Sequence, residues 1–153
     1  MRPGETQNSE PLLGPADPPP FEFIGRRGSA RCLVVADHAG NAVPASLQGL
    51  GLGQDVFQEH IAVDIGSRAT ASLLAERLCA PLILANYSRL VVDLNRDLND
   101  PTAFIPQSDG VVIPGNQNLS AAEKRHRGDS IHRPYHDTID DLIGEFLVFS
   151  NMK

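Results

Sequence analysis

Apolar residues occur along the chain in short continuous runs separated by polar, glycine-containing segments. Residues 31–36 read RCLVVA and residues 82–85 read LILA. Continuous apolar runs of this length are typical of strands that are covered on both faces. A third run, at 90–94, predicts another strand of the same kind.

Two segments carry apolar residues at the spacing of a helix instead. The first covers residues 64–78 and begins at Asp64, whose carboxylate is predicted to cap free N–H groups. The second begins with a capping box of Ser120 and Glu123, and Pro134 is expected to kink or divide it. The apolar residues of the first helix lie close to one face, and they are Ile65, Ala69, Leu73, Leu74 and Leu78.

Strands and helices therefore alternate with short connections, which predicts an α/β fold with a mixed or parallel sheet flanked by helices. The length of 153 residues suits one domain. Residues 1–20 are rich in proline and contain only Leu12 and Leu13 as large aliphatic residues, so they are predicted to form a disordered tail. The domain is expected to cover residues 21–153.

Charge and composition exclude several classes of partner. The net charge of -6 gives no reason to expect nucleic acid or an anionic membrane as a partner. No apolar run approaches the roughly 18 residues of a spanning helix. The two cysteines are spaced like neither a zinc ribbon nor a redox pair, and a reducing cytoplasm is the expected compartment. The oligomeric state does not follow from the sequence.

Polar residues directly after the first predicted strand are the strongest candidates for chemistry. Asp37, His38 and Asn41 follow the run that ends at Ala36. Functional groups of open α/β sheets gather beyond the carboxyl ends of strands. His38 is therefore a candidate ligand for a divalent metal or a general base. The alternative is a structural histidine that caps the loop.

Glu59, His60 and Asp64 form a second candidate group. His60 and Asp64 are four residues apart, so they share a face if both lie on one helical turn. A histidine and a carboxylate at that spacing suit zinc. The alternative is that Asp64 is an N-cap and His60 a surface residue.

Two arginines flank the third apolar run, Arg89 before it and Arg96 after it. A guanidinium group matches a carboxylate in two parallel hydrogen bonds, so either arginine is a candidate clamp for an acidic small molecule. Ion pairs with nearby aspartates explain them equally well. Downstream, His132 and His136 are spaced as in a zinc protease helix, but Arg133 replaces the required glutamate, which excludes that reading.

Five strings together resemble the N-formylglutamate amidohydrolase family, in the order in which that family has them. They are DHAGNAVP (37–44), EHIAVDIG (59–66), YSRLVVDLNRD (87–97), SDGVVIPGN (108–116) and HRPYH (132–136). The version in this chain resembles bacterial relatives of the histidine-degradation enzyme. The resemblance implies a fold similar to zinc-dependent exopeptidases, of the phosphorylase/hydrolase type, and hydrolysis of an N-formyl amino acid to formate and the amino acid.

The resemblance also implies a site with a divalent metal, expected to be zinc, and a small carboxylated substrate. It makes His38, His60 and Asp64 the candidate metal ligands, with His38, Asp64 and His136 as catalytic candidates. The residues expected to contact the substrate are Asn41, Arg89, Arg96, Asp109 and Asn116.

The chain departs from the family pattern at its end. Members usually continue beyond the HRPYH string with further strand–helix units, including a His-Ser-Phe segment, whereas this sequence stops at Lys153. The fold is therefore expected to be incomplete at the C-terminus. Two alternatives follow: a truncated, inactive remnant of such a hydrolase, and a related hydrolase acting on another small carboxylated amide.

Overall fold

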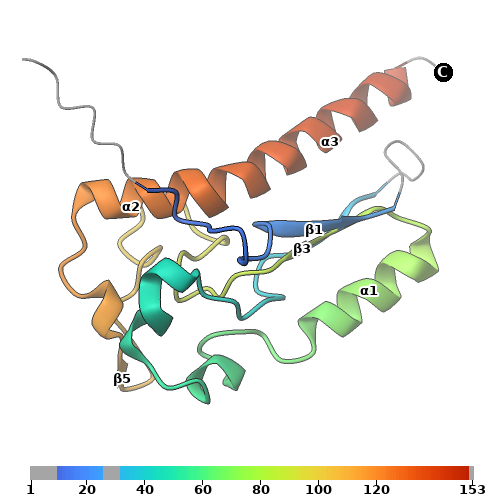
Figure 1. The fold of residues 1–153 in the computed structure, drawn as a ribbon. Coiled ribbons are helices and arrows are strands. Elements are labelled where there is room, and N and C mark those ends of the chain that lie inside the picture. Colours follow the sequence, from blue (N-terminus) through green and yellow to red (C-terminus); the bar gives the residue numbers. More distant parts are fainter. Residues whose placement is uncertain (1–9, 26–31, 152–153) are drawn as a thin grey trace, which may run out of the picture.

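A small mixed sheet lies at the centre of the molecule in the computed structural model, which describes residues 10–25 and 32–151, with side chains to Glu145. Its strands are β1 (Phe21–Ile24), β2 (Val34–Ala36) and β3 (Leu82–Ala85), in the order β1-β3-β2. β3 pairs antiparallel with β1 and parallel with β2. The α/β class and the mixed sheet are thus confirmed (Figure 1).

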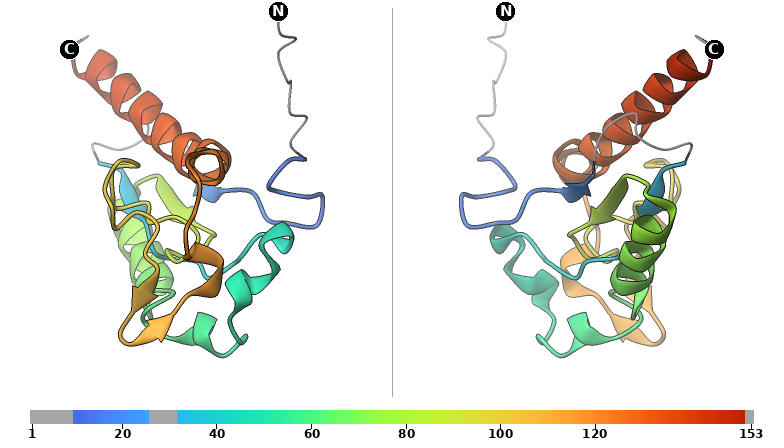
Figure 2. Two further views of the ribbon diagram at one scale, coloured as in Figure 1. Left: turned by 90° about the vertical axis from the view of Figure 1, so that its left-hand side faces the viewer. Right: turned by 90° about the vertical axis from the view of Figure 1, so that its right-hand side faces the viewer.

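Helices cover both faces of this sheet. Helix α1 (Ser67–Leu78) connects β2 to β3, and helix α3 (Arg133–Asn151) lies on the opposite side (Figures 1 and 2). A capping box of Ser120 and Glu123 opens α2 (Ala121–Arg127), as predicted. A π-helical segment, Gly128–His132, joins α2 to α3, whose second residue is Pro134. The proline therefore accompanies a change of helix type rather than a gap between two helices.

Short elements complete the described part of the chain. A hairpin consists of β4 (Gln107–Ser108) and β5 (Val111–Val112). Three 3₁₀ segments are η1 (Ala45–Gly51), η2 (Val56–Gln58) and η3 (Pro114–Asn116). None of the helices in the described part of the chain is long and apolar enough to span a membrane.

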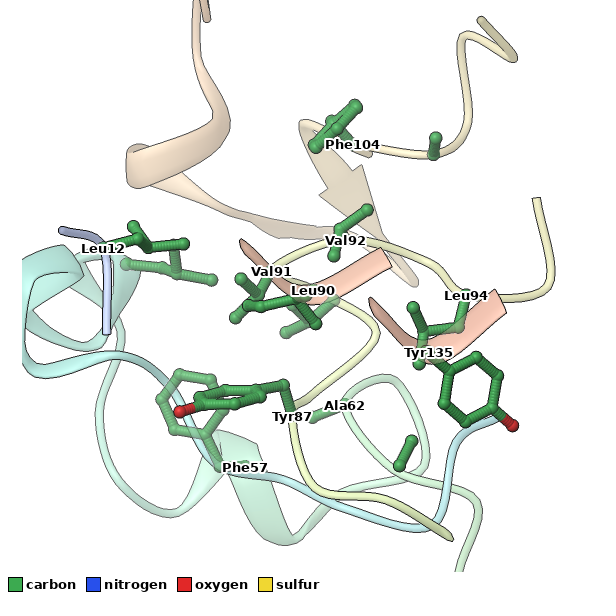
Figure 3. Close-up of a cluster of buried hydrophobic side chains, with 14 of the residues drawn as sticks. Leu12, Phe57, Ala62, Tyr87, Leu90, Val91, Val92, Leu94, Phe104 and Tyr135 are labelled. Carbon is green, nitrogen blue, oxygen red and sulfur yellow. The ribbon is translucent and has the colours of Figure 1, made fainter. Parts of the chain in front are cut away.

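The prediction of a strand at 90–94 is wrong, although the side chains of this segment do form part of the core. Leu90, Val91 and Val92 are at most 1% exposed, yet their backbone runs through turns (Figure 3). Side chains bind the carbonyl groups that a neighbouring strand would otherwise pair. Asn116 donates to the Leu90 carbonyl and Arg127 to the Val91 carbonyl. Buried backbone thus stays hydrogen-bonded without a sheet ladder.

The proline-rich segment differs from the expected disordered tail over residues 10–20; residues 1–9 lie outside the described residues. Leu12 is only 4% exposed and packs into the main core cluster. The Tyr87 hydroxyl donates to the Pro18 carbonyl at 2.6 Å, and the Asn86 side chain donates to the Pro19 carbonyl at 3.0 Å. Prolines restrict the unfolded chain, so ordering such a segment costs less entropy than its composition indicates.

Helix α1 is buried through small residues rather than through its large apolar ones. Ala71 and Ala75 are its buried residues, whereas Leu73, Leu74 and Leu78 are 48–60% exposed. The helix also begins later than predicted. Gly66 is its N-cap, in a left-handed conformation (φ 84°). Asp64 is therefore not the N-cap, which frees its carboxylate for other contacts.

Candidate active site

Three segments far apart in the sequence meet beyond the carboxyl ends of the parallel strands β2 and β3. His38 follows β2, Asp64 precedes α1, and Arg89 and Asp93 lie in the buried turn after β3. Gly40 allows the first and third segments to approach closely. A Cβ atom at Gly40 would overlap the backbone of Asn86, to whose carbonyl the Ala42 amide donates at 3.0 Å. The close approach therefore requires glycine at this position.

The centre of the site is a histidine between two carboxylates. His38 Nε2 lies 2.6 Å from Asp93 Oδ1, and His38 Nδ1 lies 3.3 Å from Asp64 Oδ2. Arg89 contacts both carboxylates, Asp64 Oδ1 at 3.2 Å and Asp93 Oδ2 at 3.3 Å. The inner pair of His38 and Asp93 is buried, whereas the Asp64 side chain is 52% exposed and that of Arg89 27%. The inner part of the site, His38 with Asp93, is therefore buried, whereas its outer part, Asp64 with Arg89, is charged and open to solvent.

The ionisation of the inner pair follows from this geometry. Burial by itself lowers the pKa of His38, but the hydrogen bond and negative charge of Asp93 outweigh it, so the pKa is raised above its ordinary value. Burial by itself has the opposite effect on Asp93 and raises its pKa, but the hydrogen bond and charge of His38 outweigh burial and lower the pKa below the usual range. Each partner therefore stabilises the charged form of the other.

Backbone and side-chain bonds fix these residues in place. The Asp64 amide donates to the His38 carbonyl at 3.0 Å, and the Asn95 amide donates to Asp93 Oδ1 at 2.9 Å. Behind His38, the buried Tyr135 hydroxyl donates to Asp37 Oδ1 at 2.6 Å, which links helix α3 to the end of β2. Burial and the Asp37 carboxylate both raise the pKa of Tyr135, so its hydroxyl remains a donor.

His60 lies outside this cluster. Residues 59–63 form turns rather than a helix, so the condition under which His60 and Asp64 would share a helical face is not met. His60 Nε2 contacts Asp109 Oδ2 at 2.7 Å, and both side chains are about 70% exposed. The structure thus brings together two of the three predicted ligands, His38 and Asp64, and places His60 beside Asp109.

Three of the other predicted site residues bind backbone atoms through their side chains. Asn41 Nδ2 donates to the Phe57 carbonyl at 2.9 Å, although Asn41 also lines a cavity of about 380 Å³. Asn116 is buried and bridges two carbonyl groups and Arg127. His136 Nε2 lies 2.8 Å from the Leu94 carbonyl, and Arg96 is exposed. Asn116 thus has a clear structural role, while the functional roles of the other three residues stay predictions.

Asp93 is the functional candidate that sequence reasoning missed, since it was considered only as an ion-pair partner for arginine. The available signal was a carboxylate inside the apolar run LVVDL. Charged residues are almost never buried without a partner, so such a position indicates a buried ion pair.

Comparison with known proteins identifies the family. The family model for N-formylglutamate amidohydrolase matches residues 30–149. The chain belongs to the N-formylglutamate amidohydrolase family.

A solved structure supports this assignment. The crystal structure of gene product Atu2144 from Agrobacterium tumefaciens is similar, with a TM-score of 0.87 and 32% sequence identity. The match covers 91% of this chain but 55% of that chain, so the present chain spans about half the length of its structural neighbour. No curated protein matches the chain.

The candidate active site fits a metal ion only in part. Among the described residues, no group of three or more His, Cys, Asp or Glu side chains is arranged to hold a metal. Two donors do fit. Ligand atoms on one tetrahedral zinc lie roughly 3.4 Å apart, and His38 Nδ1 and Asp64 Oδ2 are separated by 3.3 Å. Asp93 on the opposite ring nitrogen matches the carboxylate that commonly orients a metal-binding histidine.

Proposed function

We propose that this chain carries the site of a zinc-dependent hydrolase of N-formyl or other N-acyl amino acids, such as N-formylglutamate. The observation that carries the proposal is the arrangement of His38 between Asp93 and Asp64, with Arg89 beside both carboxylates. Family membership supports the reaction type. The side chains of Asp64 and Arg89 are open to solvent, so a small substrate can reach them.

The proposed zinc ligands in this chain are His38 Nδ1 and Asp64 Oδ2. Zinc, when bound, supplies a Lewis acid beside the scissile amide. Asp93 accepts the Nε2 proton of His38, which fixes the tautomer whose Nδ1 lone pair faces Asp64. The two-donor set needs further ligands, and the described residues do not supply a third.

Arg89 is the proposed clamp for the substrate carboxylate. Its guanidinium is partly exposed and contacts two carboxylates through different nitrogen atoms. A carboxylate of the substrate can take the place of Asp64 at the Nη1 atom of Arg89 with the same geometry. This contact holds the acyl group next to His38 and Asp64, which lowers the entropic part of the activation barrier.

Hydrolysis requires a proton to pass from water to the leaving amine. The water oxygen adds to the formyl carbon as one of its protons is removed, the C–N bond breaks as the amine nitrogen takes up that proton, and the formic acid loses its remaining proton to solvent, which gives formate and the amino acid. Asp64 is the accessible carboxylate for carrying that proton, because its side chain is half exposed and Oδ1 faces the arginine.

The test is the release of the free amino acid from N-formylglutamate, N-formylleucine and N-acetylglutamate by the purified full chain, together with its zinc content. We expect bound zinc and turnover that is greatest for N-formylglutamate. Asp64→Asn should lower kcat by at least 100-fold, because it removes the proposed proton carrier. His60→Ala is the matched control and should keep full activity, because His60 is exposed and bonded to Asp109.

Two results would contradict the proposal. A cooperatively folded chain with neither zinc nor turnover would be a hydrolase by ancestry alone. Turnover of a small carboxylated amide that is not an N-acyl amino acid, in preference to these three substrates, would instead identify a related hydrolase on the same scaffold.

A further inference from the structure

Arg68, in the first turn of helix α1, donates hydrogen bonds to both of the chain segments that form the candidate active site. Its Nε atom donates to the Ala39 carbonyl at 3.2 Å, in the loop after β2. Its Nη2 atom donates to the Ala85 carbonyl at 3.3 Å and to Asn86 Oδ1 at 2.9 Å, at the end of β3. One guanidinium group therefore bridges the loop after β2 and the segment after β3.

This bridge lies at the point where the two segments come closest. Gly40 packs there against the backbone of Asn86, and the Ala42 amide donates to the Asn86 carbonyl. Arg68 binds the carbonyl of Ala39, directly before Gly40, and the side chain of Asn86. The arginine thus holds both sides of the close approach that creates the site.

The chain around the start of α1 also holds the backbone of His38. The Asp64 amide donates to the His38 carbonyl at 3.0 Å, and the Ser67 hydroxyl donates to the same oxygen at 3.3 Å. The next carbonyl, that of Ala39, is the one that Arg68 Nε binds. Arg68 therefore extends a local support of His38 across to the segment after β3.

The shape of the guanidinium group matters more for this bridge than its charge. Arg68 Nη1 also pairs with Glu22 Oε2 at 2.9 Å, but the two side chains are 41% and 49% exposed. An ion pair that is this exposed contributes little to stability. The other three acceptors are uncharged oxygens that need several donors in one plane, which arginine presents and lysine does not.

We propose that Arg68 is a positioning residue of the candidate active site, which holds the loop after β2 and the segment after β3 at the separation that the site needs. The first segment carries His38, and the second carries Arg89 and Asp93. The consequence for turnover rests on the proposed function. Without the bridge, Arg89 still binds the substrate carboxylate, but the acyl group is no longer held at His38, so kcat falls and KM changes little.

Hydrogen exchange of the zinc-free full chain, followed by NMR, tests the bridge without reference to catalysis. The amides of Ala42 and Ser88 form backbone bonds between the two segments, so their exchange reports local separation. Arg68→Met keeps the aliphatic stem and removes the donors, and it should speed the exchange of both amides roughly tenfold. The Val34 amide, at the opposite end of β2, should exchange at its wild-type rate.

Two further variants sharpen the test. Arg77→Met is the matched control, because Arg77 is exposed in the last turn of the same helix, and it should leave exchange and kcat unchanged. Arg68→Lys keeps the charge and should behave like Arg68→Met. In the hydrolase assay, both Arg68 variants should lower kcat roughly tenfold or more while KM stays within about twofold of the wild-type value.

Wild-type exchange at Ala42 and Ser88 in Arg68→Met would overturn the proposal. Equal acceleration at Val34 would also overturn it, because it would show only a general loss of stability. Wild-type exchange or kcat in Arg68→Lys would overturn the bridge and assign the role of Arg68 to its charge. A wild-type chain without turnover would instead contradict the proposed function, and the exchange rates would still decide whether Arg68 holds the two segments together.

Discussion

At the scale of single residues, the candidate site depends on a buried ion pair. His38 and Asp93 are each less than 10% exposed and lie 2.6 Å apart. Removing one partner of a buried pair leaves the other without compensation, which is costly. The pair is therefore expected to contribute both to the chemistry of the site and to the stability of the fold.

This pair gives the stability of the zinc-free chain a defined pH dependence. The raised pKa of His38 stabilises the fold below its unfolded value of 6.5, and this contribution is lost as the pH rises through the folded pKa. The lowered pKa of Asp93 stabilises the fold above its unfolded value of 3.8, and that contribution is lost as the pH falls through the folded pKa. The pair is thus most stabilising between pH 3.8 and 6.5.

We accordingly expect Asp93→Asn to lower the free energy of unfolding by about 3 kcal/mol at pH 5.5 and by less at pH 9. Urea denaturation at the two pH values measures the difference. Asp109→Asn is the control, because the exposed pair of Asp109 and His60 contributes less than about 1 kcal/mol. Equal losses for Asp93→Asn at both pH values would show that His38 is not charged in the folded chain.

At the scale of elements, the site is created by the close approach of the loop after β2 to the segment after β3. Residues Ala42 and Tyr87 extend the parallel pairing of these segments as an isolated bridge. Between them, Gly40 packs against the backbone of Asn86 without room for a side chain. A change that moves the loop after β2 away from the segment after β3 would therefore also move His38 away from Asp93.

Gly40→Ala should therefore destabilise the fold by about 3 kcal/mol through overpacking and abolish activity. Gly144→Ala in helix α3 is the matched control, because nothing lies within 4 Å of the added Cβ atom. It should stabilise the fold by about 0.5–1 kcal/mol, since alanine is the better helix former. Thermal melting and formate release measure both variants. A Gly40→Ala variant with normal stability would mean that the loop can move without loss of the fold.

At the scale of the whole molecule, the proposed zinc binding would be linked to stability. A ligand that binds the folded chain raises its stability by about 2.7 kcal/mol at a concentration 100 times its Kd. His38 and Asp64 come from segments 26 residues apart, so the unfolded chain does not present them together.

We therefore expect zinc to raise the Tm of the full chain, and this shift should disappear in Asp64→Asn but persist in His60→Ala. Differential scanning calorimetry with and without zinc measures it. Asp64 is half exposed, so its replacement by asparagine leaves the zinc-free Tm nearly unchanged. A zinc shift that depends on His60 as well as on Asp64 would instead support the ligand set predicted from the sequence, which contains both residues.

The sequence by itself determined the features that depend on local patterns. The two continuous apolar runs at β2 and β3, the capping box at Ser120 and the five family strings predicted the fold class, two strands, one helix start and the family. They also named His38, Asp64 and Arg89 as candidates, each beside a structural alternative, and the structure places Asp64 in contact with both of the other residues.

Tertiary structure alone decided the features that depend on contacts between residues far apart in the sequence. The apolar run at 90–94 is a turn because Asn116 and Arg127 bind its carbonyl groups. The large apolar residues of α1 face solvent because the small Ala71 and Ala75 pack against the sheet. His60 contacts Asp109, and Asp93 contacts His38, across 49 and 55 residues. Spacing along a sequence reports neighbours within an element, whereas these contacts join different elements.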